Sequence, residues 1–200
     1  MSDSTTQNIE QAEDGRYSTA GAYVHEGEEY NRDTTYIEDR IVADPEHAEL
    51  AEGARAWPVE AGRYRLVAAR ACPWANRTLI VRRLLGLEDA ISLGLCGPTH
   101  DKNSWTFDLD PGGVDPVLQI PRLKDAYEKR IPGYPKGITV PAMVDVPTGE
   151  VVTNDFPQIT IDFSLEWTAY HRDGAPQLYP EHLRAEIDEV SKGIYTEVNN

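Results

Sequence analysis

Several features that would assign a protein to a class at once are missing from this sequence. There is no run of about 18 apolar residues, so no membrane-spanning helix is expected. The N-terminus has neither the basic nor the apolar stretch of a signal peptide, which predicts a cytoplasmic protein. The five histidines have no metal-ligand spacing and there is no glycine-rich phosphate loop, so no metal site is predicted.

Positive charge is also scarce. The chain has 34 acidic and 19 basic residues, a balance that argues against nucleic acid as a partner, because its binders neutralise phosphates with Lys and Arg. The excess acid lies in residues 1–60, which carry fifteen acids and four bases, whereas the remainder is nearly balanced. We expect residues 1–20 to be a disordered acidic leader and residues 21–60 to be an irregular N-terminal arm.

Cysteine is nearly absent, and the two that occur, Cys72 and Cys96, exclude a disulfide scaffold. Cys72 stands between an apolar strand pattern and Pro73, where a helical pattern begins. At a helix N-terminus the unpaired N–H groups and the helix dipole favour thiolate, the nucleophilic form of cysteine. The alternative is a buried, inert cysteine, which is our interpretation of Cys96 at the end of a predicted strand.

The neighbours of Cys72 refine the predicted chemistry. A dithiol oxidoreductase has its second cysteine three residues after the first, but this chain has Ala75 there. A mixed disulfide on Cys72 must therefore be resolved by an external thiol. Arg70 and Arg77 are close enough in sequence to add positive charge. The pattern predicts monothiol chemistry, in which Cys72 attacks and a small thiol then releases the adduct.

The order of strand and helix patterns predicts an α/β fold of the thioredoxin type over residues 61–167, with a mixed four-stranded sheet and helices on both faces. Gly86 ends the first helix, and a long loop rich in Gly, Pro and Asp follows the second strand. The predicted elements are a strand at 63–69, a helix at 73–85, a strand at 91–95, a loop at 97–116, a helix at 117–131, a strand at 138–146, a strand at 151–153 and a helix up to about 166.

The last part of the chain has a different pattern. We expect residues 168–180 to be a linker. Within residues 181–200 apolar side chains recur at helical spacing with no stop signal. This predicts the first helix of a truncated, all-α C-terminal domain. The apolar stripe consists of Leu183, Ile187, Val190, Ile194 and Val198.

Three further places could bind a ligand, and each has a simpler interpretation. Pro141 is either an edge-strand proline or part of a cis Val140–Pro141 bond that exposes backbone to an extended thiol, and we favour the cis bond. Asn154 or Asp155 caps the helix that follows; Asp155 either does no more than this or, with the first N–H groups of that helix, recognises a ligand's ammonium and carboxylate. Trp105 either stacks on a ligand or anchors its loop.

The sequence resembles the glutathionyl-hydroquinone reductases, also called xi-class or omega-like glutathione transferases. The resemblance covers about residues 60–200 well. It is strongest at 63–89, around Ala-Cys-Pro-Trp-Ala-Asn-Arg. Further matches are Ser-Trp-Thr-Phe at 104–107, Ile-Thr-Val-Pro at 138–141, Asp-Val-Pro-Thr-Gly-Glu-Val-Val at 145–152, Leu-Tyr-Pro-Glu-His-Leu-Arg-Ala-Glu-Ile-Asp at 178–188 and Ile-Tyr-Thr-Glu-Val-Asn-Asn at 194–200.

The resemblance implies a thioredoxin-like domain, a helical C-terminal domain and a homodimer. It also implies reduction of S-glutathionyl-hydroquinones, an aromatic conjugate, with glutathione as co-substrate. Cys72 would take the glutathionyl group as a mixed disulfide, and a second glutathione would release oxidised glutathione. Trp105 and Val140, the latter through its backbone beside Pro141, would hold glutathione.

The sequence departs from the family's pattern at the residues that bind the γ-glutamyl end of glutathione in the family. The family has Asn-Asn-Glu-Ser-Ser, whereas this chain has Asp155 on a shorter stem and Phe156 without a hydroxyl, although its N–H remains. Asn76 replaces the usual histidine after Trp-Ala. A hydroxyl-rich thiol such as mycothiol would not need the same contacts, so mycothiol is the alternative co-substrate. The alternative function is a non-catalytic thioredoxin-like binding or assembly module with a structural Cys72.

Overall fold

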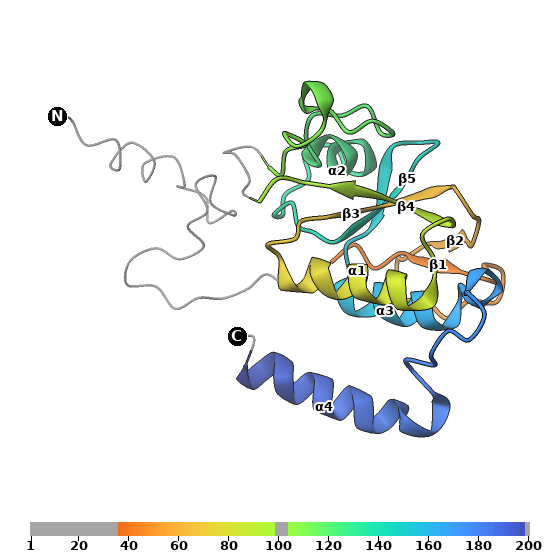
Figure 1. The fold of residues 1–200 in the computed structure, drawn as a ribbon. Coiled ribbons are helices and arrows are strands. Elements are labelled where there is room, and N and C mark those ends of the chain that lie inside the picture. Colours follow the sequence, from red (N-terminus) through yellow and green to blue (C-terminus); the bar gives the residue numbers. More distant parts are fainter. Residues whose placement is uncertain (1–35, 99–103, 199–200) are drawn as a thin grey trace.

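The computed structural model describes residues 36–98 and 104–198 (Figure 1). The predicted acidic leader, residues 1–20, lies outside the described residues. Within the described ranges the chain forms six strands and four α-helices, with short 3-10 turns between some of them.

A mixed four-stranded sheet forms the centre of the fold. Its strands are β3 (Tyr64–Ala68), β4 (Ile91–Leu95), β5 (Ala142–Asp145) and β6 (Glu150–Thr153), in the order β4-β3-β5-β6. β3 runs parallel to β4 and antiparallel to β5, and β5 is antiparallel to β6. This is the sheet of the thioredoxin-like fold, and the predicted fold class is confirmed.

Helices cover both faces of this sheet. α1 (Pro73–Leu85) and α3 (Phe156–Leu165) pack together on one face, and α2 (Lys124–Arg130) lies on the other (Figure 1). Every residue of β3 is buried for this reason. Two apolar clusters result, one toward α2 around Val67, Leu123, Tyr127 and Val144, the other toward α1 and α3 around Leu66, Leu85, Met143 and Phe163.

α1 has the bounds that the sequence predicts. It ends at Gly86, whose φ of 75° is left-handed and whose N–H donates to the Arg83 carbonyl. A Cβ at this position would lie 2.6 Å from Cβ of Arg172. Glycine is therefore required here both for its conformation and for the close approach of the chain that follows α3.

The predicted helix at 117–131 is wrong over its first half, because only Lys124–Arg130 is helical. The Asp115 carboxylate accepts hydrogen bonds from the N–H groups of Val117 and Leu118 at 2.9 and 2.7 Å. Gln119 then adopts a positive φ of 56°. Such a side-chain turn competes with helix formation, and Pro121 has no N–H to continue one.

The arm was expected to be irregular, and this is wrong for two segments. β1 (Arg40–Val42) and β2 (Ala56–Pro58) form a parallel pair. The buried carboxylate of Asp39 accepts hydrogen bonds from the Trp57 ring at 2.9 Å and from the Arg130 guanidinium at 2.6 Å. This carboxylate joins the two strands to each other and to α2.

The C-terminal region is helical. α4 (Arg184–Glu197) follows a short turn, Glu181–Leu183, and lies on the α1 and α3 side of the sheet (Figure 1). In the predicted apolar stripe only Ile187 is partly covered, while Val190 and Val198 are 54% and 74% exposed. No helix among the described residues has the length and apolar character to cross a membrane.

Candidate functional site

Cys72 is the N-cap residue of α1. Its backbone is extended, with φ −89° and ψ 117°, and its carbonyl accepts the first helical hydrogen bond, from Asn76 N–H at 2.9 Å. Pro73 occupies the first helical position, where its missing N–H has no cost. The first turn of α1 contains no acidic residue. The partly buried sulfur therefore lies at the positive end of the helix dipole, as the sequence predicts.

The loop before β5 lies against this sulfur. The Val140–Pro141 bond is cis, as predicted, and β5 begins only at Ala142. The Cys72 thiol donates to the Val140 carbonyl, with Sγ and O 3.4 Å apart. The fold thus brings Cys72, Val140 and Pro141 together.

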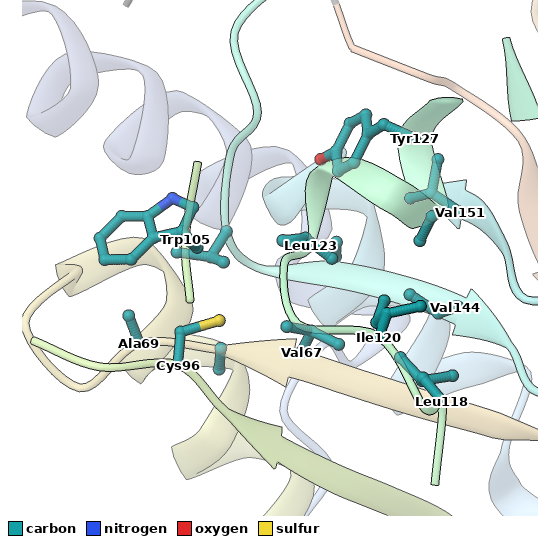
Figure 2. Close-up of a cluster of buried hydrophobic side chains, with 14 of the residues drawn as sticks. Val67, Ala69, Cys96, Trp105, Leu118, Ile120, Leu123, Tyr127, Val144 and Val151 are labelled. Carbon is teal, nitrogen blue, oxygen red and sulfur yellow. The ribbon is translucent and has the colours of Figure 1, made fainter. Parts of the chain in front are cut away.

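Trp105 lies in the apolar cluster toward α2. It is 9% exposed and packs in the cluster that contains Ala69, Cys96 and Leu123 (Figure 2). Its carbonyl accepts from Leu123 N–H at 3.0 Å. These contacts fit the anchoring interpretation. The same cluster includes Val140 and contacts Cys72, so Trp105 and the sulfur share one apolar environment.

Asp155 is the N-cap of α3, and its carboxylate accepts a hydrogen bond from Gln158 N–H at 3.3 Å. Burial raises the pKa of the Asp155 carboxyl, the bond from Gln158 lowers it, and the charge of Glu38 raises it further. The simpler interpretation, helix capping, accounts for the observed hydrogen bond. Asn154, the other predicted cap, makes different contacts.

Phe156, at the first position of α3, is 5% exposed and lies within a group of aromatic rings. Its ring centroid is 5.7 Å from that of Trp74, 6.1 Å from that of Tyr36 and 6.4 Å from that of Tyr195. These rings come from the arm, α1, α3 and α4. Sequence reasoning missed Tyr36 and Tyr195, because no local pattern links residues so far apart in the chain.

Asn154 connects two parts of the site and was considered above only as a cap. It is 2% exposed. Its Oδ1 accepts from Ile37 N–H at 2.8 Å, and its Nδ2 donates to Thr139 Oγ1 at 2.7 Å. The one signal in the sequence that could have drawn attention to Asn154 is its place directly before Asp155, a predicted binding residue.

The other predicted charged and sulfur groups lie apart from this arrangement or at its surface. Cys96 is 3% exposed, and burial raises the pKa of its thiol, with a further increase from Asp115 and Asp108. Its sulfur points into the apolar cluster (Figure 2), in agreement with a structural role. Arg70 and Arg77 are exposed. Within 36–98 and 104–198 no group of three or more acidic, His or Cys side chains could hold a metal ion.

Comparison with known proteins identifies the domain. Residues 71–162 match the family model of the glutathione S-transferase N-terminal domain. Over residues 71–162 this chain is therefore similar to glutathione S-transferase N-terminal domains. The matched residues include Cys72, the cis proline and the start of α3, so most of the candidate site lies within the matched region.

Relatives with solved structures support the same assignment. A glutathione transferase from Gordonia bronchialis DSM 43247 is 84% identical, with a TM-score of 0.77 over 83% of this chain and 49% of its own. The Xi glutathione S-transferase of Phanerochaete chrysosporium is 35% identical, with a TM-score of 0.74 over 86% of this chain and 56% of its own.

Glutathionyl-hydroquinone reductase YqjG of Escherichia coli is 35% identical over 87% of this chain and 53% of its own. Its glutathione-bound structure aligns with a TM-score of 0.73 over 82% of this chain and 53% of that chain. The resemblance to the glutathionyl-hydroquinone reductases and xi-class transferases is confirmed. The chain spans about half the length of the curated relatives it matches.

Proposed function

We propose that this domain serves a thiol-dependent reductase or transferase that removes a glutathionyl-type group from S-conjugated hydroquinones through a mixed disulfide on Cys72. The observation that carries the proposal is the position of the Cys72 sulfur, at the N-terminus of α1 and 3.4 Å from the Val140 carbonyl. The similarity to YqjG, named a glutathionyl-hydroquinone reductase, supports the substrate class.

The proposed reaction has two steps that balance. In the first, the Cys72 thiolate attacks the sulfur of the conjugate, an S–S bond forms, the carbon–sulfur bond breaks, and the ring carbon takes up a proton. In the second, an external thiolate attacks the mixed disulfide and displaces Cys72 as thiolate. The conjugate is reduced to the hydroquinone, and the glutathionyl-type group leaves together with the external thiol as one disulfide. Ala75 supplies no resolving sulfur, so the second step requires the external thiol.

In this proposal the co-substrate lies between the cis-proline loop and the N-terminus of α3. Val140 binds it through the backbone beside Pro141, and Trp105 forms part of the apolar wall near the sulfur. Asp155 and Phe156 lie at the far end, where the helix N-terminus attracts negative charge. The second substrate is the aromatic conjugate, and the protein acts as a homodimer.

Two co-substrates fit different observations. Glutathione is favoured by the relative YqjG, whose structure is described as glutathione-bound. A mycothiol-type thiol is favoured by the α3 N-terminus, where the Asp155 carboxylate caps the helix and the Phe156 ring packs among aromatic rings. The test is turnover of S-conjugated hydroquinones with each thiol. Equal or faster turnover with glutathione than with mycothiol would exclude the second choice.

The reactivity of Cys72 distinguishes the proposed enzyme from the competing function, a non-catalytic binding module. We expect iodoacetamide to modify Cys72 with a pH midpoint well below 8, because the helix N-terminus stabilises thiolate. The rate is measured from pH 4 to 10 in the unchanged chain and in Cys72→Ser. A midpoint at the ordinary value of about 8.5 for a free thiol would favour the binding module.

A further inference from the structure

Two of the segments that carry residues assigned above to thiol binding are connected by one side chain. The first segment is the loop at 138–141, and the second is the start of α3 at 154–156. The Asn154 amide donates to Thr139 Oγ1 with Nδ2 and Oγ1 2.7 Å apart. Thr139 directly precedes Val140, and Asn154 directly precedes Asp155. One hydrogen bond therefore joins the two halves of the proposed thiol site.

The other side of the same amide is bound to the arm. Oδ1 of Asn154 accepts from Ile37 N–H at 2.8 Å, and the Ile37 carbonyl accepts from Thr153 Oγ1 at 2.6 Å. Both polar atoms of the amide are thus paired in a 2% exposed side chain. Rotating the amide by 180° would place donor against donor at Ile37, so its orientation is fixed.

The loop that Asn154 contacts is also bound on its other sides. The Tyr127 hydroxyl donates to the Thr139 carbonyl at 2.9 Å, and the Val140 carbonyl accepts from the Cys72 thiol at 3.4 Å. The Thr139 hydroxyl is one point at which the start of α3 contacts this loop. Small errors in the placement of binding groups cost large factors in reaction rate.

We infer that Asn154 is a positioning residue for the thiol site, which sets the separation between the Val140 backbone and the N-terminus of α3. This inference rests on the proposed function, in which both segments hold the co-substrate. It differs from a purely structural role in one respect. A structural hydrogen bond contributes to stability alone, whereas a positioning bond also changes how Cys72 reacts with a disulfide that must occupy the site.

The test compares two reactions of Cys72 in the full chain. With oxidised glutathione, the thiolate attacks one sulfur, a mixed disulfide forms and one glutathione thiolate leaves. With iodoacetamide, the reagent needs no thiol site. The second-order rate constant with oxidised glutathione, divided by that with iodoacetamide, measures how much binding at the thiol site accelerates the reaction of Cys72. The series is repeated with mycothiol disulfide, so that either co-substrate is covered.

Three variants change the bridge. Thr139→Val removes the hydroxyl at nearly constant shape, and we expect the ratio to fall about tenfold, as for one lost hydrogen bond at the site. Thr139→Ser keeps the hydroxyl and should stay within about threefold of the unchanged chain. Asn154→Leu should lower the ratio at least as far as Thr139→Val. The double variant should be no worse than Asn154→Leu alone, because both changes break the same bond.

A matched control separates stability from positioning. Tyr64→Phe removes a hydrogen bond to the Pro58 carbonyl, 2.6 Å long, at the end of β3 away from Cys72. It should lower the urea midpoint and leave the ratio unchanged. An unchanged ratio in Thr139→Val and Asn154→Leu would overturn the inference. If the unchanged chain itself shows no higher ratio than free cysteine with either disulfide, the proposed function fails, and the inference with it.

Discussion

At the scale of single residues, the two cysteines differ in what surrounds their sulfur atoms. Cys72 is partly buried at a helix N-terminus, whereas Cys96 is 3% exposed within an apolar cluster. Burial raises the pKa of the Cys96 thiol, and nearby carboxylates raise it further. Since only thiolate is nucleophilic, the same reagent should distinguish the two residues.

We predict that iodoacetamide at neutral pH modifies Cys72 and leaves Cys96 unmodified in the folded protein. Each unit of pKa difference changes the thiolate fraction about tenfold, so we expect the rates to differ by at least about tenfold. Peptide mass spectrometry over a time course measures both rates. Cys96→Ala should retain the fast modification and Cys72→Ser should lose it. Modification of Cys96 at a comparable rate would contradict the burial argument.

At the scale of elements, the start of α3 depends on Asp155, which caps the helix while its pKa is raised by burial. A raised pKa means that the folded state binds the proton more tightly than the unfolded state. The stability that comes from the protonated carboxyl is complete below the ordinary pKa of 3.8 and is lost as the pH rises through the folded value. At neutral pH the capping hydrogen bond of Asp155 therefore stabilises the folded state, whereas the burial of its charged carboxylate destabilises it.

We predict that Asp155→Asn, which keeps a capping oxygen without the charge, becomes more stable relative to the unchanged chain as the pH rises from 3.8 toward 7. Asp155→Ala should cost about 1 kcal/mol of unfolding free energy through loss of the cap. Urea unfolding at a series of pH values measures both effects. A stability difference between Asp155→Asn and the unchanged chain that does not vary with pH would show that burial does not raise the pKa of this carboxyl.

The sequence predicts elements well where the signal is local. β4 and α1 have their predicted bounds, because an apolar strand pattern, a proline at the first helical position and a glycine stop are all readable within a few residues. The helix at 117–131 fails because Asp115 forms a side-chain turn that its apolar spacing conceals.

At the scale of the whole molecule, the decisive contacts join segments that are far apart in the chain. Ile37 and Asn154 are 117 positions apart, and Arg40 and Asp162 are 122 apart. No periodicity or motif indicates such pairs, so Cys72 and the cis proline could be predicted while the link from the arm to the thiol site could not. Through the bond between Ile37 and Asn154, the arm forms part of the structure around the site.

The final prediction concerns how the arm is held. The Asp39 carboxylate is buried, and it accepts from the Arg130 guanidinium at 2.6 Å and from the Trp57 ring at 2.9 Å. Asp39→Ala leaves the guanidinium, 13% exposed, without this carboxylate, and removing one partner of a buried pair costs about 3–5 kcal/mol. We expect a loss of at least about 2 kcal/mol, since Arg130 retains some contact with water.

Urea unfolding, followed by Trp fluorescence, measures this loss against a matched control. Asp44 also contacts a side chain that can be basic, with its carboxylate 2.8 Å from the His47 ring, but both side chains are exposed, so Asp44→Ala should change the unfolding free energy by less than about 0.5 kcal/mol. A single transition that shifts as a whole in Asp39→Ala would show that the arm unfolds together with the sheet. An early separate transition would show that the arm detaches first, and an unchanged midpoint would contradict the role assigned to Asp39.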